Sequence, residues 1–528
     1  TSLLPPHRQG LPCCLTGKLV YPLTSPSLFY LLKVVKITIV ILSFGEQKLL
    51  KLANFINGEY SEPVSQKYLN NINPSTGETY SLVPDSDIND VENAIKAAKD
   101  AFPLWAQKTA QERAGFLYKI ADLLESKIPE FANAESKDQG KPLSLSSTVD
   151  IPRAVYNFRF FAGAILHHHE ISTNLNNIAI NYTTRRPLGI VGLISPWNLP
   201  LYLLTWKIAP AIATGNTVVC KPSEFTSMTA YMLGEVLNRV GLPPGVCNIV
   251  LGTGQNVGSE IVAHPDVQGI SFTGGTLTAK SIITDSAPYF KKLSLELGGK
   301  NPNIIFDDAD LDECIPTTIR SSFSNQGEIC LCGSRIFVQE KIYNQFLERF
   351  VSETKKIIVG NPFDKKTGMG PLVSEAHLNK VLYYINLARE EGGMIAFGGT
   401  RPEMIREFKN GFFLNPTIIT GLNSSCRVMK EEIFGPVVTV TPFKTEEEVI
   451  KYANSSQYGL SASVWTKDLN RAHSVAAAID AGTVWVNTWM LRDLRVPFGG
   501  TKASGIGREG GEHSIDFYTE VKNICIKF

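Results

Sequence analysis

Hydrophobic and polar residues alternate with two different periods along most of the chain. In residues 87–102 the apolar positions fall on one face of a helix, and residues 111–126 repeat that pattern. Short apolar runs typical of buried strands then recur about every 20–30 residues, at 188–194, 217–220, 248–251, 269–273 and 293–297. Helical stretches such as 226–240 separate them. This alternation predicts repeated βα units in a doubly wound parallel sheet.

A second α/β series follows residue 303. Its expected strands lie at residues 335–338, 416–420 and 437–442, and its expected helices at 341–357 and 446–454. Two α/β domains that meet near residue 300 are therefore expected. A ligand cleft would then lie at their junction, beside the carboxyl ends of the strands.

Composition narrows the class of protein. The chain has 528 residues, 43% of them hydrophobic, and 51 basic residues nearly balance 50 acidic ones. This composition excludes a disordered or coiled-coil protein, and a net charge of +1 provides no field that attracts nucleic acid or an anionic membrane. Nine cysteines without a C-x-x-C pair favour free thiols in a reducing compartment, and no metal is expected. A cytoplasmic location is expected by default, since we identify no credible targeting signal.

The first 46 residues differ from the rest of the chain. Up to Gly45 they hold four basic and no acidic residues, and Lys33 and Lys36 interrupt the apolar run 28–44. Each lysine would cost about 2.5–3.5 kcal/mol at the centre of a bilayer, and a signal peptide carries its charges before its apolar core. We interpret residues 1–46 as a leader that is non-native or disordered. A functional anchor is the alternative.

Polar residues directly follow three of the expected strands. The amide of Asn198 can donate to a developing oxyanion, although a helix-capping asparagine in a proline turn is the alternative. Lys221 and Glu224 could hold ribose hydroxyls or form a surface ion pair. Glu296 ends an apolar strand, where desolvation raises the pKa of a carboxyl towards values that suit a general base. The two glycines after Glu296 would let a ligand approach the backbone.

A cysteine in a glycine-containing loop adds a nucleophile. Cys330 lies in the run SNQGEICLCGSR (residues 324–335), after an expected helix. A thiolate is the strongest nucleophile that a side chain offers near neutral pH. An isolated cysteine is usually a packed core residue, but Cys330 lies within a specific sequence motif.

In this order, the four segments resemble the aldehyde dehydrogenase superfamily, and the resemblance extends from residue 54 to residue 528. Further motifs that match are FTG at 272–274, EEIFGP at 431–436, WVN at 485–487 and PFGG at 497–500. The resemblance implies an α/β fold with two doubly wound domains and a small β oligomerisation flap.

The resemblance also implies how the chain is organised into domains. Residues 47–164 and 188–298 would form an NAD-binding domain, 299–503 a catalytic domain, and 165–187 with 512–528 the oligomerisation segments. Strands near 178–184 and 519–526 would complete a partner's sheet, so a homo-oligomer, either a dimer or a tetramer, is expected.

In the superfamily's mechanism a cysteine thiolate attacks the aldehyde, and Cys330 matches that cysteine, whereas Cys332 is expected to be a packed or accessory thiol. The Asn198 amide and the backbone N–H of Cys330 would hold the oxyanion. Glu296 would activate the water that hydrolyses the resulting thioester to a carboxylic acid.

NAD is the expected cofactor, because a glutamate at position 224 would accept ribose hydroxyls and repel a 2′-phosphate. Ala279 stands where the superfamily commonly has a glycine near the pyrophosphate. The residues that match cofactor contacts are Ile194, Ser195, Pro196, Trp197, Lys221, Ser223, Glu224, Gly254, Phe272, Thr273, Gly274, Gly275, Leu297, Glu432 and Phe434.

The substrate is expected to be a small aldehyde. Segments 150–153, 195–207, 326–332 and 516–520 are most similar to the subfamily that oxidises 2-aminomuconate 6-semialdehyde in the kynurenine pathway of tryptophan catabolism. Arg153 and Arg492 match arginines that suit a substrate carboxylate; salt bridges are the alternative.

The subfamily is also described as a retinal dehydrogenase, and Tyr202, Leu203, Trp206 and Trp489 could line an apolar tunnel for retinal. A catalytically silent binding protein of the same fold is a further alternative. The histidines 167–169 are interpreted as an exposed or interface patch on a helix without an acidic partner.

Overall fold

The computed structural model describes residues 49–528. The expected leader, residues 1–46, lies outside the described part of the chain. Within residues 49–528, no helix combines the length and the apolar character that crossing a membrane requires.

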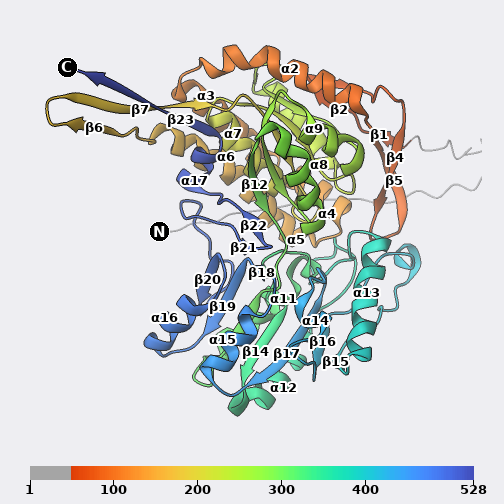
Figure 1. Cartoon of the computed structure of the whole chain (residues 1–528). Coiled ribbons are helices and arrows are strands. Elements are labelled where there is room, and N and C mark those ends of the chain that lie inside the picture. Colours follow the sequence, from red (N-terminus) through yellow and green to blue (C-terminus); the bar gives the residue numbers. More distant parts are fainter. Residues whose placement is uncertain (1–48) are drawn as a thin grey trace, which may run out of the picture. The chain divides into compact units, whose positions relative to one another are not determined.

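An eight-stranded sheet forms the core of the half of the molecule that lies uppermost in Figure 1. Its strands, in spatial order, are β22 (Gly505–Ile506), β12 (Lys292–Glu296), β11 (Val267–Thr273), β8 (Ile190–Ile194), β9 (Thr217–Lys221), β10 (Cys247–Ile249), β2 (Asn54–Ile56) and β3 (Glu59–Ser61). The strands from β12 to β10 are parallel, and antiparallel strands close both edges. The prediction of a parallel sheet is confirmed.

A seven-stranded sheet forms the core of the other half. Its order is β15 (Met394–Phe397), β16 (Thr417–Thr420), β17 (Val437–Phe443), β14 (Arg335–Gln339), β13 (Pro302–Ile305), β19 (Ser461–Trp465) and β20 (Thr483–Val486). All neighbouring strands are parallel except the edge pair β15–β16. The predicted α/β fold class is therefore confirmed for both halves.

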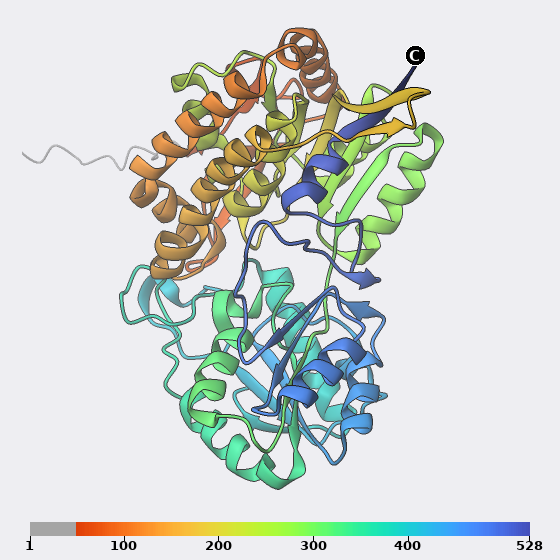
Figure 2. The same ribbon diagram turned by 90° about the vertical axis from the view of Figure 1, so that its left-hand side faces the viewer.

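Helices cover both faces of each sheet, as Figure 2 shows for the first. The helices of the first half are α2 (Ile88–Ala106), α3 (Ala110–Ser126), α4 (Ile128–Gln139), α5 (Leu143–Leu145), α6 (Ile151–Leu166), α7 (Pro200–Ala213), α8 (Met228–Arg239), α9 (Ser259–Ala263) and α10 (Thr276–Ser286). Those of the second are α11 (Leu311–Phe323), α12 (Tyr343–Thr354), α13 (Glu375–Glu390), α14 (Arg427–Lys430), α15 (Glu446–Asn454) and α16 (Leu469–Ala478), with α17 (Gly511–Phe517) near the C-terminus.

Alternating side chains of each strand explain why both faces are covered. Along β8, Val191 and Leu193 pack in the cluster that contains α3, α6, α7 and α8. Ile190 and Ile194 pack in the opposite cluster, with α2, α9 and α10. Because successive side chains of a strand point to opposite faces, an all-apolar strand needs a helical layer on each side.

Local signals define where the predicted helices begin. Asp87 and Asp90 form a capping box at the start of α2, and Thr109 with Glu112 forms another at the start of α3. Each box satisfies backbone N–H groups that the first helical turn leaves unpaired. These two helices therefore begin within a residue of their predicted starts.

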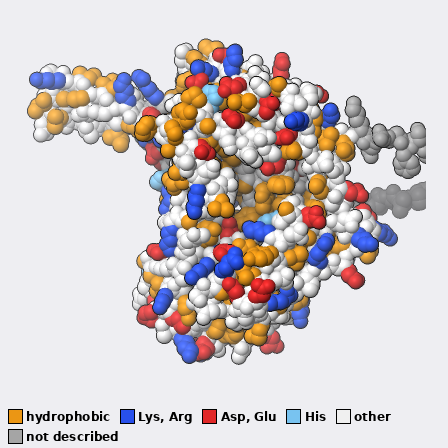
Figure 3. All heavy atoms as spheres, turned by 45° about the vertical axis from the view of Figure 1, so that its right-hand side comes forward, with side chains coloured by type: hydrophobic (Ala, Val, Ile, Leu, Met, Phe, Trp, Pro, Cys, Tyr) orange, Lys and Arg blue, Asp and Glu red, His pale blue; other side chains and the backbone are white. Residues whose placement is uncertain are grey.

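A three-stranded sheet projects from the first half as an arm (Figures 1 and 3). It contains β6 (Ser172–Leu175), β7 (Ala179–Pro187) and β23 (Thr519–Lys527), all antiparallel. Its exposed apolar side chains include Ile178, Val521 and Ile526. Two further small sheets contain β1 (Leu50–Lys51), β5 (Glu78–Pro84) and β4 (Tyr68–Asn73), and β18 (Tyr458–Gly459) with β21 (Thr501–Lys502).

A C-terminal segment returns to the first sheet and pairs with the strand that ends at Glu296. In this pair, β12–β22, Glu296 lies opposite Gly505. The backbone N–H of Leu297 donates to the carbonyl of Ser504 at 2.9 Å, and the Ser504 hydroxyl donates to the carbonyl of Gly298 at 2.7 Å. The segment thereby fixes the backbone where the chain leaves β12.

Candidate active site

The carboxyl ends of four neighbouring parallel strands bring the predicted polar residues to one edge of the first sheet. Thr273 at the end of β11 lies opposite Glu296 at the end of β12. Ile194 at the end of β8 lies between Phe272 on one side and Lys221 on the other. Since these strands run in the same direction, the loops that leave them meet at this edge.

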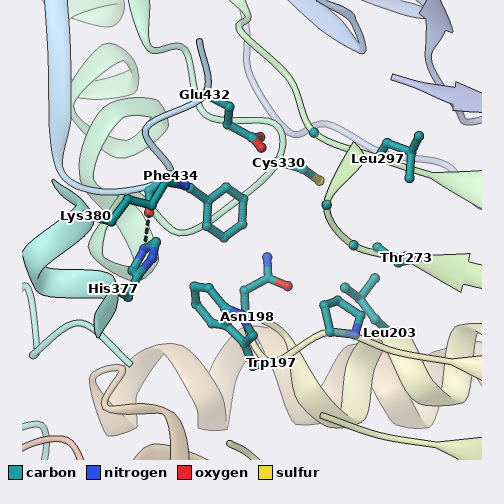
Figure 4. Close-up of a pocket in the computed structure, with 14 residues that line it drawn as sticks. Trp197, Asn198, Leu203, Thr273, Leu297, Cys330, His377, Lys380, Glu432 and Phe434 are labelled. Atoms are coloured by element: carbon teal, nitrogen blue, oxygen red, sulfur yellow. Dashed lines mark hydrogen bonds between the residues drawn. The ribbon is translucent and has the colours of Figure 1, made fainter. Parts of the chain in front are cut away.

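A cavity of about 260 Å³ opens at this edge (Figure 4). Ten of its lining residues were predicted as site residues: Pro196, Trp197, Asn198, Thr273, Gly274, Gly275, Leu297, Cys330, Glu432 and Phe434. The sulfur of Cys330 and the amide of Asn198 point into the same space in Figure 4. Loops from both sheets therefore contribute to one site.

Asn198 is fixed on both its backbone and its side chain. Its Nδ2 donates to the carbonyl of Glu328 at 2.8 Å. Its own carbonyl accepts from Lys141 Nζ at 2.9 Å and from Asn325 Nδ2 at 3.0 Å. An amide nitrogen carries two protons, so one donor remains for a bound oxygen atom.

Lys141 belongs to a buried charge cluster that the sequence did not reveal. Its ammonium forms ion pairs with Glu135, at 3.5 Å, and with Asp150. All three side chains are buried, and a buried charge requires such partners. Asp150 directly precedes α6, the helix that carries Arg153, so the cluster links the backbone of Asn198 to the start of that helix.

The loop of Cys330 is held by Asn301, which lies between β12 and β13. The Asn301 amide donates to the carbonyl of Cys330 at 2.7 Å and to that of Cys332 at 2.9 Å. Its oxygen accepts from the backbone N–H of Ser461 at 3.1 Å. Cys330 lines the cavity, whereas Cys332 is buried and lines a separate small pocket.

The two glycines after Glu296 let other parts of the protein approach the backbone closely. A Cβ on Gly298 would lie 2.2 Å from Glu432 Oε2, and one on Gly299 would lie 2.8 Å from the carbonyl oxygen of Cys330. The backbone N–H of Gly299 donates to Glu432 Oε1 at 2.8 Å. Protein groups thus approach both glycines closely, and Gly298 also lines the cavity, so a ligand at this backbone stays a prediction.

Glu296 is buried, and neither of its carboxyl oxygens has a hydrogen-bond partner within residues 49–528. Burial raises the pKa of this carboxyl well above its ordinary value, and the nearby Glu509 carboxylate raises it further. Lys207 and Arg492 act in the opposite direction. The direction of the shift is the one predicted from the strand-end position.

Glu509 was not predicted as a site residue and forms a second buried cluster behind Glu296. One of its oxygens accepts from Lys207 Nζ at 3.0 Å, and the other accepts from Trp206 Nε1 at 2.6 Å. Lys207 Nζ also donates to Ser271 Oγ at 3.0 Å. No sequence signal marked this contact, because Glu509 lies in a loop more than two hundred residues from its partners.

Burial raises the pKa of the Cys330 thiol to about 12, and the carboxylates of Glu296 and Glu432 contribute to the increase. The guanidinium of Arg492 has the opposite effect, because a cation stabilises the thiolate. The protonation state of Cys330 therefore depends on charges from both halves of the molecule.

The expected adenosine-ribose contacts lie beyond the cavity, after β9. Lys221 Nζ and Glu224 Oε2 form an ion pair of 2.8 Å in which the lysine is buried, so the pair is not a surface salt bridge. Ser223 is buried in the same turn and accepts from the backbone N–H of Phe225 at 3.3 Å. Ser195 follows β8, and its N–H donates to the carbonyl of Lys221 at 3.1 Å.

Of the other residues predicted to contact the cofactor, some have open space beside their backbone and others are buried in the hydrophobic core. Gly254 and Gly275 have no atom within 4 Å of an added Cβ. The ring of Phe272 packs within 2.4 Å of where a Cβ on Gly274 would lie, and Ile194 is likewise a core residue. Ala279 is buried in the same hydrophobic cluster and does not line the cavity, so its methyl group leaves this space open.

A dinucleotide fits this arrangement. Gly274 and Gly275 line the cavity without side chains, Glu224 presents a partly exposed carboxylate for ribose hydroxyls, and Glu432 presents another within the cavity. This donor and acceptor set suits a nicotinamide cofactor.

His377 and Lys380, both on α13, line the cavity but were not predicted. His377 Nε2 donates to the carbonyl of Phe434 at 2.6 Å, and Trp197 contacts both rings with centroid separations of 5.1 and 5.4 Å. Phe434 has a φ of 63°, which is rare for a large side chain. The histidine thus stabilises the strained backbone that directs the Phe434 ring into the cavity (Figure 4).

Arg153 and Arg492 meet at one aromatic side chain. The guanidinium carbon of Arg153 lies 5.9 Å from the ring centroid of Tyr202, and Arg492 donates to the Tyr202 hydroxyl at 3.0 Å. Arg492 also lies 3.9 Å from the ring centroid of Phe498. Within residues 49–528 neither arginine forms an ion pair, whereas the nearby Arg495 pairs with Asp493 at 2.5 Å.

The histidines 167–169 lie beyond the end of α6 and not on a helix, so that expectation is wrong. His168 has an acidic partner, Glu512, at 2.8 Å. Across residues 49–528 no group of three or more His, Cys, Asp or Glu side chains is arranged to hold a metal ion.

A thiol and an amide donor that face one cavity, together with glycines and carboxylates that suit a dinucleotide, are the arrangement of an enzyme that oxidises aldehydes with a nicotinamide cofactor. Residues 60–524 match the aldehyde dehydrogenase family, and the chain belongs to that family.

The 2-aminomuconic semialdehyde dehydrogenase of Mus musculus is 55% identical over 487 residues, which cover 92% of this chain and 100% of that protein. The 2-hydroxymuconic semialdehyde dehydrogenase of a Pseudomonas species is 45% identical over 90% of this chain and 99% of that protein. The NAD⁺ complex of a Bacillus cereus aldehyde dehydrogenase superposes with a TM-score of 0.88 at 41% identity, covering 90% of this chain and 97% of that one. A catalytically silent binding protein is not favoured by these similarities.

Proposed function

We propose that this enzyme oxidises a carboxylate-bearing semialdehyde, 2-aminomuconate 6-semialdehyde, to the dicarboxylic acid with NAD. The observation that carries the proposal is the pair of arginines, Arg153 and Arg492, which share Tyr202 and have no carboxylate partner within residues 49–528. A half-buried guanidinium group without a counter-ion attracts an anion, and two such groups can together bind the two oxygens of the single carboxylate of this substrate. The similarity to semialdehyde dehydrogenases from mouse and bacteria supports the assignment.

In the proposed reaction, Cys330 Sγ attacks the aldehyde carbon, and a C–S bond forms as the C=O double bond becomes a single bond. Asn198 Nδ2 and the backbone N–H of Cys330 donate to the resulting oxyanion. The C–H bond of the former aldehyde carbon then breaks as the C=O bond re-forms, which leaves a thioester on Cys330; a bound NAD would supply the acceptor for this hydride. Glu296 then takes a proton from the water that attacks the thioester, and the C–S bond breaks to release the acid and free the thiol.

NAD is proposed over NADP because of Glu224. Its carboxylate is held by Lys221 at 2.8 Å and would accept hydrogen bonds from both ribose hydroxyls. A 2′-phosphate at the same position would meet a like charge. Glu432 is proposed to bind the nicotinamide ribose and Phe434 to pack against the nicotinamide ring.

We further propose that the arm formed by β6, β7 and β23 joins copies of this chain into a dimer or tetramer. Its exposed apolar residues Ile178, Val521 and Ile526 support this, because exposed apolar strand edges tend to pair. The domain division given above, with a cofactor-binding and a catalytic half, is part of the same proposal.

The test is NADH formation by the purified enzyme with three aldehydes: 2-hydroxymuconate 6-semialdehyde, hexanal and retinal. Preference for the first over hexanal, a six-carbon aldehyde without carboxylates, is expected. Equal kcat/KM values for these two would contradict the acidic substrate class. A preference for retinal would instead favour an apolar tunnel, for which Leu203 and Trp489 are candidates.

A further inference from the structure

Tyr202 lies between the two arginines but is not itself charged. It is on the first turn of α7, four residues after Asn198, and its side chain is 4% exposed. Its hydroxyl accepts from Arg492 at 3.0 Å, and its ring faces the Arg153 guanidinium at 5.9 Å. One side chain therefore contacts two cations that come from distant parts of the chain.

The backbone of Tyr202 is fixed relative to Arg153. Asn157 lies one turn after Arg153 on α6, so both residues project from the same face of that helix. Its amide donates to the carbonyl of Tyr202 at 3.0 Å and to the Thr205 hydroxyl at 3.1 Å. The distance between α6 and α7 at this level is thereby set by buried hydrogen bonds.

The position of Arg492, in contrast, depends on its side-chain contacts. It lies in a loop without regular secondary structure, between β20 and β21. Its guanidinium stacks on Phe498 at 3.9 Å and lies 5.8 Å from the Trp206 ring centroid. Stacking restrains the plane of a guanidinium but leaves it free to slide across the ring, whereas a hydrogen bond fixes one of its nitrogen atoms. The Tyr202 hydroxyl supplies that bond.

We propose that Tyr202 is the positioning residue that determines specificity, because its hydroxyl holds Arg492 at the separation from Arg153 that an acidic semialdehyde requires. This inference rests on the proposed substrate class. It assigns to Tyr202 no contact with the reacting atoms. Its hydroxyl orients a cation, and that cation binds the carboxylate of the substrate.

The test is Tyr202→Phe, which removes only the hydroxyl. The wild type and the variant are compared with 2-hydroxymuconate 6-semialdehyde and with hexanal. We expect KM for the acidic substrate to rise about tenfold, since a hydrogen bond to a charged group is lost, while kcat for both substrates and KM for hexanal change less than about twofold.

Tyr156→Phe is the matched control. The Tyr156 ring lies 5.8 Å from the same Arg153 guanidinium, but its hydroxyl makes no hydrogen bond with residues 49–528 and the side chain is 47% exposed. We expect its KM values to match the wild type. A Tyr202→Phe effect that is absent, or equal for the two substrates, would overturn the inference. A wild type that does not discriminate between the two substrates would instead refute the substrate class itself.

Discussion

The side-chain amide of Asn198 donates to the backbone carbonyl of Glu328, with 2.8 Å between the two atoms. Asn198 follows a strand of the first sheet, whereas Glu328 lies in the Cys330 loop of the second half, two residues before the cysteine. The bond therefore connects the two halves at the nucleophile. It also sets the direction in which the second amide proton points.

Replacing Asn198 by alanine should lower kcat/KM for aldehydes by about 100- to 1,000-fold, because a preorganised oxyanion donor is lost. Binding of NAD, followed by quenching of tryptophan fluorescence, should stay within a few-fold of the wild type. Normal kcat/KM in this variant would exclude the amide as an oxyanion donor.

Cys330→Ala should eliminate NADH formation and leave NAD binding intact, because the thiol is the proposed point of attachment of the substrate. The matched control is Cys332→Ala: this thiol is buried two residues away and does not line the cavity. We expect the control to retain most of its activity. Loss of activity in Cys332→Ala alone would reverse the two assignments.

The pH dependence of kcat/KM should reflect the charge of Arg492. Burial and two carboxylates raise the pKa of Cys330 to about 12, and Arg492 opposes that shift. Only the thiolate attacks, so activity rises with pH, and Arg492→Leu should move this rise to higher pH. Hexanal is the appropriate substrate because it has no carboxylate. The loss of Arg492 therefore cannot also remove a contact between the enzyme and a substrate carboxylate.

The control for that experiment is Arg495→Leu, since Arg495 is exposed and already paired with Asp493. Its profile should coincide with that of the wild type. If Arg492→Leu also leaves the profile in place, the guanidinium does not stabilise the thiolate.

His377 should contribute to the pH dependence of stability. Burial, assisted by Lys380, lowers the pKa of its ring to about 4. The pKa of His377 is lower in the folded than in the unfolded state, so the folded form binds fewer protons. The free energy of unfolding therefore decreases as the pH falls from about 6.5 to about 4, by up to about 3 kcal/mol.

This is measured as the Tm difference between the wild type and His377→Gln, whose amide can still donate to the carbonyl of Phe434. The difference should shrink as the pH is lowered from about 7 to about 4.5. A difference that is constant with pH would mean that the ring titrates normally.

Much of this site was accessible from the sequence because its residues end all-apolar strands. Strands buried on both faces read as continuous hydrophobic runs, so the ends of β8, β9 and β12 were visible, and with them Asn198, Lys221 and Glu296. The clustering of these ends at one edge follows from parallel pairing.

Other parts of the fold and of the site have no comparable pattern in the sequence. The edge strands β22, β2 and β3 contain only two or three residues each, too few to show a period. His377 and Lys380 lie in the first turns of α13, where polar residues usually face solvent. Lys141 likewise reads as a surface lysine, and only tertiary contacts show that it binds the carbonyl of Asn198.

The pairing of β12 with β22 has a consequence for biosynthesis. The edge partner of β12, Gly505–Ile506, and the buried Glu509 lie more than two hundred residues further along the chain than Glu296, so they leave the ribosome well after the strand that they complete. A truncated chain that stops before Gly505 would retain Asn198, Glu296 and Cys330 but would leave the edge of β12 open to other strands. Only chains that have been translated past Glu509 can therefore complete this edge, so a nonsense mutation shortly before Gly505 should be as damaging as one before Glu296.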